Sequence, residues 1–252
     1  MNVYKNISYR ESLRFLGRGI YRFFRFQPFT FLKRVRIYLQ DLQTFLKLHP
    51  SEEKIILYPE LNEKLDYTPV DPVFFYQDTW FAYHIFRIKP SHHYDVGSSL
   101  MTMGIISQNI PVTFIDIRPP RGVSLPNFYF LKGSIVNLPF PDEYVETISS
   151  LCVIEHVGLG RYGDDLDPQG SEKAIQELIR VIKKKGYLFL STLVGRENRI
   201  YFNAFRTFAR AYLLELFQNT EIIEEKYIYD FYLLDEYDPQ KEGVGLYLLR
   251  KK

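Results

Sequence analysis

The chain has 252 residues, of which 46% are apolar and 17% aromatic, and its formal net charge is +2. This composition supplies a sizeable hydrophobic core and excludes a globally disordered protein. The single cysteine, Cys152, excludes a disulfide framework and favours a reducing, cytoplasmic setting. We expect neither a membrane-spanning helix nor a secretory signal, because charged residues interrupt every long apolar stretch.

Positive charge is concentrated near the N-terminus. Residues 1–49 carry ten Lys or Arg against two acidic residues, a charge of +8, which leaves +2 − 8 = −6 for the remainder. A basic stripe spaced by four residues predicts a helix over 8–26, followed by a second helix over 30–48. The stripe consists of Arg10, Arg14, Arg18 and Arg22. We expect residues 8–36 to hold the protein at an anionic membrane surface, peripherally at its inner face.

Two alternatives for this basic segment stay open. It could pack against the rest of the chain, with its arginines merely solvated. It could also bind nucleic acid, which we consider a less favoured partner because the remainder is net negative and shows no nucleic-acid-binding module.

Prolines mark residues 50–73 as a connector, so the sequence predicts a helical extension over 1–73 and an α/β domain over 74–252. A helix is expected over 77–88. From residue 92, short apolar strands alternate with helical stretches, which is typical of a parallel sheet covered by helices on both faces. The expected strands are 92–97, 112–117, 128–132, 146–153, 187–193, 221–229 and 244–250, and the expected helices are 100–109, 171–184 and 203–217. No helix separates the last two strands, so they should pair antiparallel.

Acidic residues and glycines follow the predicted strands at the edge where open α/β sheets bind ligands. Asp95 and Gly97 close the first strand, and Asp116 closes the second, about twenty residues after Gly97. A glycine there lets a ligand approach the backbone, and a carboxylate such as that of Asp116 can accept two hydrogen bonds from a ribose diol.

Five segments in this order, DVGSS, FIDIRP, GSIVNLPFPD, CVIEHV and ELIRVIKKKGYLFLST, resemble class I S-adenosylmethionine-dependent methyltransferases over residues 92–194 and more loosely over 195–250. The words EHVGLGRYGD, FFYQDTW and VGR…FNAFR resemble a branch known only as a domain of unknown function, found among bacterial surface-polysaccharide genes. The resemblance implies a Rossmann-like sheet of seven mostly parallel strands with an antiparallel last strand, and S-adenosylmethionine as cofactor. The cofactor contacts expected from the strand ends and the resemblance are Asp95, Gly97, Ser99, Asp116, Ser134, Ile135 and Glu155.

The first loop departs from the superfamily pattern, because residues 95–101 contain one glycine where three are usual. Ser99 could still bond a ligand carboxylate, but Met101 is expected to narrow the space. A dinucleotide would fit less well, because its pyrophosphate must touch the backbone.

The segment EHVGLGRYGDDLDPQG, residues 155–170, follows the fourth strand and should lie on the substrate side as a lid. His156 is the natural general base, although it could instead buttress the loop through a backbone hydrogen bond. Arg161 and Tyr162 offer a donor and a stacking face to a sugar or phosphate. Arg196, Asn203 and Arg206 could bind an acidic acceptor, or cap a helix starting near Asn203.

The acids Asp164, Asp165 and Asp167 raise the question of a metal ion. The pattern from Asp165 begins like a calcium loop but has Gln176 at the twelfth position instead of Glu. An acid-x-acid triplet also resembles the metal-binding acids of sugar-nucleotide glycosyltransferases. We expect no metal, since acids are favoured next to a helix N-terminus anyway.

Three functional hypotheses follow. The first is a methyltransferase acting on a saccharide or its lipid-linked precursor. The second is a non-catalytic scaffold that keeps the fold, and the third is a metal-dependent glycosyltransferase. The sequence predicts no oligomeric state.

Overall fold

The computed structural model of the chain describes residues 28–48, 57 and 59–252. It divides into two compact units, with the division between Pro69 and Val70. In the first unit α2 (Pro28–Leu48) forms one continuous helix, as predicted, with Pro28 at the first helical position, where a missing N–H costs little. The predicted helix over 8–26 lies outside the described residues. No helix in the described part of the chain is long and apolar enough to cross a membrane.

The second unit is built on an eight-stranded sheet in the order β3-β2-β1-β4-β5-β10-β8-β9. The strands are β1 (His93–Val96), β2 (Val112–Asp116), β3 (Phe128–Lys132), β4 (Val145–Leu151), β5 (Ile182–Val194), β8 (Thr220–Tyr229), β9 (Tyr232–Leu234) and β10 (Gly243–Lys251). The first five run parallel, and β10 lies antiparallel between β5 and β8. This confirms the mostly parallel sheet and its antiparallel last strand. The short β9 adds an edge strand that the sequence analysis did not predict.

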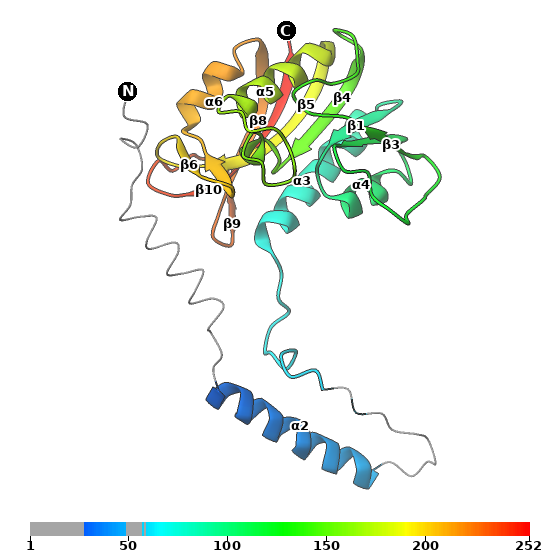
Figure 1. Cartoon of the computed structure of the whole chain (residues 1–252), viewed down its shortest axis with the longest axis vertical. Coiled ribbons are helices and arrows are strands. Elements are labelled where there is room, and N and C mark those ends of the chain that lie inside the picture. Colours follow the sequence, from blue (N-terminus) through cyan, green and yellow to red (C-terminus); the bar gives the residue numbers. More distant parts are fainter. Residues whose placement is uncertain (1–27, 49–56, 58) are drawn as a thin grey trace. The chain divides into compact units, whose positions relative to one another are not determined.

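Helices cover both faces of this sheet, giving three layers (Figure 1). One face carries α3 (Pro72–Ile88) and α4 (Leu100–Ile106), and the other carries α5 (Gly170–Val181) and α6 (Arg210–Leu216). Phe81 and Ile85 of α3 are fully buried against one face, and Ile175 and Leu178 of α5 against the other. Two apolar layers therefore fix the sheet, and its strand ends form a stable edge for a site.

Two helix boundaries differ from expectation for local reasons. The helix predicted to start at residue 77 begins at Pro72, because the Asp71 side chain accepts hydrogen bonds from the N–H groups of Val73 and Phe74. At the other end of the domain, α5 ends at Val181 instead of continuing to residue 184, and Ser171 is its second residue and not its N-cap. Residues 183–186 are instead extra residues in β5, since Val145 pairs with Ile182 but Thr147 pairs with Tyr187.

The predicted helix over 203–217 is wrong in its first half. Residues 199–207 form a hairpin of β6 (Arg199–Tyr201) and β7 (Phe205–Thr207), and α6 starts only at Arg210. Aromatic and β-branched residues flank a tight turn at Asn203, which has a φ of +61°. Asn203 is therefore a turn residue and does not cap a helix.

Candidate functional site

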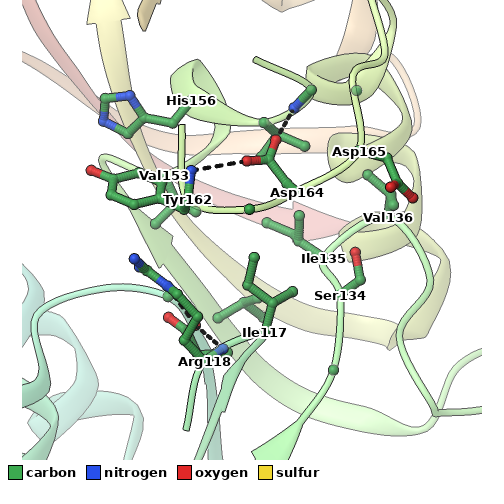
Figure 2. A pocket seen from close by; sticks show the side chains of 18 of the residues that line it. Ile117, Arg118, Ser134, Ile135, Val136, Val153, His156, Tyr162, Asp164 and Asp165 are labelled. Atoms are coloured by element: carbon green, nitrogen blue, oxygen red, sulfur yellow. Dashed lines mark hydrogen bonds and ion pairs between the residues drawn. The ribbon is translucent and has the colours of Figure 1, made fainter. Parts of the chain in front are cut away.

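A cavity of about 440 Å³ opens where the carboxyl ends of β1, β2 and β4 meet the 155–170 loop (Figure 2). Its size lies within the range of small-molecule sites, about 300–1,000 Å³. Six of the residues predicted from the sequence line it: Gly97, Asp116, Ser134, Ile135, His156 and Tyr162. They come from four separate chain segments, which the parallel sheet brings to one edge. Met101, expected to narrow this space, is instead 78% exposed on α4 and does not line the cavity.

Asp116 ends β2 with its carboxylate held in a turn. One oxygen accepts a hydrogen bond from the backbone N–H of Arg118 at 2.6 Å, and the Arg118 Nε lies 3.7 Å from the same oxygen. The Arg118 guanidinium extends over the Tyr162 ring, 4.4 Å from its centroid. This contact joins the β2 side of the cavity to the 155–170 loop. Because Arg118 contacts only one oxygen of Asp116, the second oxygen is available to a ligand.

The middle of the cavity is lined by apolar side chains. Ile117, Ile135, Val136 and Val153 line it between two polar ends. Figure 2 shows Ser134 and Asp165 on one side of these apolar residues, and His156 and Tyr162 on the other side. Such a slot suits a flat heterocycle with polar groups at its two ends.

His156 follows β4 in the short 3-10 helix η1 (Ile154–His156). Its Nδ1 lies 2.7 Å from the backbone oxygen of Ala204, and a carbonyl only accepts, so Nδ1 carries the proton. In the neutral ring Nε2 is then the free acceptor. Burial and the nearby Arg161 guanidinium lower the pKa of His156, which keeps the ring neutral near pH 7. His156 therefore makes the backbone hydrogen bond expected of a buttress and also has an unprotonated nitrogen, as a general base requires.

The 155–170 loop is folded around the Asp164 carboxylate. Its oxygens accept hydrogen bonds from the N–H groups of Gly158 at 2.7 Å, Tyr162 at 3.2 Å and Gly160 at 3.4 Å. The loop closes at its neck, where the Asp167 N–H donates to the Gly158 oxygen at 3.0 Å. These bonds make the loop a preformed wall of the cavity.

Arg206, predicted to bind substrate, is buried beneath this wall. It is 4% exposed, and its guanidinium donates to the backbone oxygens of Pro168 at 2.7 Å and Asp167 at 3.1 Å. Its position on β7 therefore clamps the loop onto the hairpin. Arg161 donates to the Ala204 oxygen at 3.0 Å beside His156. Neither arginine lines the cavity, and the exposed Arg196 and Asn203 do not line it either.

Three other predicted cofactor residues point away from the cavity. Ser99 is the N-cap of α4, accepting from the Thr102 N–H at 3.3 Å. Glu155 is 2% exposed, and Thr192 donates to it at 3.2 Å; burial raises its pKa to about 7. Asp95 is fully buried. The sequence analysis missed Ile117, Arg118, Val136 and Val153, although each directly neighbours a residue or strand end that it did single out, and it considered Asp165 only as a metal ligand.

Asp95 supports the first loop from below. Its carboxylate accepts hydrogen bonds from the Ser98 N–H at 3.1 Å and from the Ser149 hydroxyl. The Ser149 oxygen lies 2.9 Å from Nε2 of His93, whose Nδ1 lies 2.9 Å from the Thr147 hydroxyl. Burial raises the pKa of Asp95 to about 7. The chain of hydroxyls and imidazole can satisfy either form of Asp95, since each member can reverse its donor and acceptor roles.

We expect Asp95→Asn to remove a pH dependence of stability. The folded-state pKa of about 7 exceeds the ordinary 3.8, so the folded protein holds a proton that the unfolded chain releases between these values. This contribution to stability is present below about pH 4 and is lost as the pH rises through 7. Asn can accept from Ser98 and donate to Ser149, as protonated Asp does.

The measurement is denaturant unfolding of both proteins from pH 4 to pH 8. The free-energy difference should shift by roughly 3–4 kcal/mol in favour of the Asn variant over this range. The lowered pKa of His93 affects both proteins and cancels in the comparison. A difference that does not change with pH would show that Asp95 stays ionised.

Comparisons with known proteins agree with this architecture. A model of the family described as "Caenorhabditis protein of unknown function, DUF268" matches residues 140–229, which include the 155–170 loop. No protein of curated function matches the sequence.

Three solved structures share the fold. The [4+2]-cyclase SpnF has a TM-score of 0.52 and 16% identity, covering 69% of this chain and 81% of its own. A putative sarcosine dimethylglycine methyltransferase from Galdieria sulphuraria has a TM-score of 0.52 and 13% identity, covering 71% and 86%. The 1,6-didemethyltoxoflavin-N1-methyltransferase of Burkholderia thailandensis, with S-adenosylhomocysteine bound, has a TM-score of 0.50 and 13% identity, covering 75% and 93%.

These likenesses define the class of fold, the Rossmann-like fold of class I methyltransferases. At such identities they show the fold alone, and one of the three proteins is a cyclase, so the reaction must be argued from the site.

The acidic residues of the loop do not assemble a metal centre. Asp164 is engaged by three backbone N–H groups, and Asp167 accepts from Lys173 at 2.6 Å. Among the described residues, no group of three or more His, Cys, Asp or Glu side chains is placed to hold a metal ion.

Proposed function

We propose that the chain is an S-adenosylmethionine-dependent methyltransferase whose cofactor occupies the cavity at the edge of β1, β2 and β4. The observation that carries this proposal is the lining itself. Gly97, Asp116 and the Ser134–Ile135 pair line one continuous cavity together with His156. The apolar slot of Ile117, Ile135 and Val136 would hold the adenine ring, and Asp116 would accept from the ribose diol.

The charge of the cavity supports a cationic ligand. Asp116, Asp164, Asp165 and Asp167 line it together with Arg118, and Lys173 pairs with Asp167 from outside the lining. A sulfonium would be attracted to this field, whereas a pyrophosphate would be repelled from it. The same argument disfavours a dinucleotide, or a nucleotide sugar whose diphosphate is not held by a metal ion.

When bound, S-adenosylmethionine supplies an electrophilic methyl group on its sulfonium. The protein's own residues then have to hold the acceptor in line and take its proton. Nε2 of His156 is the acceptor for that proton, because Nδ1 already donates to the Ala204 oxygen. The Tyr162 ring meets the imidazole edge to face at 5.5 Å and restrains its orientation.

The acceptor itself we propose to be a saccharide or a lipid-linked saccharide, on the strength of the sequence resemblance. Tyr162 lines the cavity beside His156 and offers a ring on which a sugar could stack. Release of S-adenosylhomocysteine on adding saccharide acceptors, compared with protein or nucleic acid, tests this class.

Calorimetric titration with S-adenosylmethionine tests the cofactor assignment and separates the enzyme from a non-catalytic scaffold. We expect Asp116→Ala to weaken binding by about tenfold to a hundredfold, since a charge-assisted hydrogen bond contributes roughly 1.5–3 kcal/mol. Asp116→Asn is the matched variant, because it can still accept from the Arg118 N–H and keeps the turn. Equal affinity in all three proteins would remove Asp116 from the site, and no binding to the wild type would refute the proposal.

A further inference from the structure

The helix α2 has a continuous apolar face. At 3.6 residues per turn, eight of its apolar and aromatic side chains fall within one arc of about 140° that no polar residue interrupts, while Ile37 and Leu48 lie outside it. The arc consists of Phe31, Leu32, Val35, Tyr38, Leu39, Leu42, Phe45 and Leu46. Leu32 is 62% exposed, and Leu39 and Leu46 are each 51% exposed. This is a large apolar surface for one helix to present to solvent.

Two polar contacts of α2 with the connector lie outside the apolar arc. Arg34 donates to the Asn62 side chain, and Lys64 pairs with Asp41 at 2.8 Å. On the helical wheel Arg34 and Asp41 lie outside the apolar arc.

Cations border the apolar arc on both sides. Arg34 lies next to one border, and Arg36 and Lys47 lie near the other. With Lys33 and Asp41 the helix carries a charge of +4 − 1 = +3. Long basic side chains at such borders keep their charge at the level of lipid phosphates while the apolar arc enters the acyl boundary.

We propose that α2 lies in the surface of an anionic lipid bilayer, with Leu32, Leu39 and Leu46 inserted and its bordering cations on the headgroups. A second copy of the helix suits the arc less well, because a coiled-coil seam is narrower and two helices of +3 would repel at their borders. A spanning helix does not fit, since five charged residues are distributed along α2. The proposal does not depend on the reaction that the α/β unit performs.

The test is flotation of the full chain with phosphatidylcholine vesicles, with and without phosphatidylglycerol, at low salt. Wild type should float with the anionic vesicles, and added salt should weaken this binding. Leu39→Gln with Leu46→Gln keeps the charge and the helix propensity but removes two inserted side chains, so binding should weaken by roughly a hundredfold. Gln40→Ala with Thr44→Ala changes the opposite face and should stay within about threefold of wild type.

A third variant separates the contribution of the cations from that of the inserted leucines. Arg34→Gln, Arg36→Gln and Lys47→Gln together should cost roughly a hundredfold on anionic vesicles, at about 1 kcal/mol per cation. Thermal unfolding of each variant serves as the control for folding. No flotation with phosphatidylglycerol, or leucine variants that float like wild type, would overturn the proposal. A lipid-free dimer that the leucine variant converts to monomer would overturn it in favour of a second copy.

Discussion

Replacing His156 is expected to lower methyl transfer about a hundredfold while leaving cofactor affinity nearly unchanged. General base catalysis contributes about 10²–10⁴ in rate, and His156 lines the cavity with Nδ1 bound to the Ala204 oxygen, which leaves Nε2 unprotonated. The matched pair is His156→Ala and His156→Gln. The Gln amide can still donate to the Ala204 oxygen and fill the space beside Tyr162, but it has no basic nitrogen. Both variants should lose turnover, measured as S-adenosylhomocysteine released with a saccharide acceptor.

The pH profile gives a second readout that a buttress would not change. Because burial and Arg161 lower the pKa of His156, the neutral base persists to a pH below the ordinary value of about 6.5. Wild-type turnover should therefore be flat above neutral pH and fall on acidification, and both variants should lose this acid limb. If His156→Gln kept full turnover while His156→Ala lost thermal stability, the residue would be a buttress alone.

The parallel core of the sheet was predictable because its strands are apolar on both faces. Runs such as 112–116 and 187–193 read as buried strands whatever lies beside them. The hairpin at 199–207 was not predictable in the same way. Its aromatic residues occur at spacings that fit a helix as well as a strand, and the turn at Asn203 decides between them.

The candidate site was predictable to the level of strand ends but not of side-chain directions. Asp116 and His156 line the cavity, whereas Asp95, one residue before the end of β1, and Glu155, inside η1, are buried in the protein. Successive residues of a strand point to opposite sides, so an offset of one position reverses the role of a residue such as Asp95. The direction of the Arg206 side chain was not predictable either, because it depends on the β6–β7 hairpin, which tertiary contacts stabilise.

Gly158→Ala is expected to be the most damaging small substitution in the loop. Gly158 has a φ of +79°, and a Cβ there would lie 2.0 Å from the backbone oxygen of Asp167. A backbone atom cannot move aside without opening the neck, where the Asp167 N–H now donates to Gly158. Strain and the lost bonds together should lower the free energy of unfolding by roughly 3 kcal/mol.

Opening the neck should also remove a wall of the cavity, so S-adenosylmethionine affinity should fall at least about tenfold. Gly122→Ala is the matched control away from the cavity: its φ is +76°, but a Cβ there meets no atom within 4 Å. It carries only the conformational strain, about 1 kcal/mol, and should keep the cavity and the affinity. Denaturant unfolding, calorimetric titration and amide exchange across residues 158–167 measure the contrast. Equal effects from the two substitutions would show that the neck contact does not hold the loop, because then only the shared positive φ would matter.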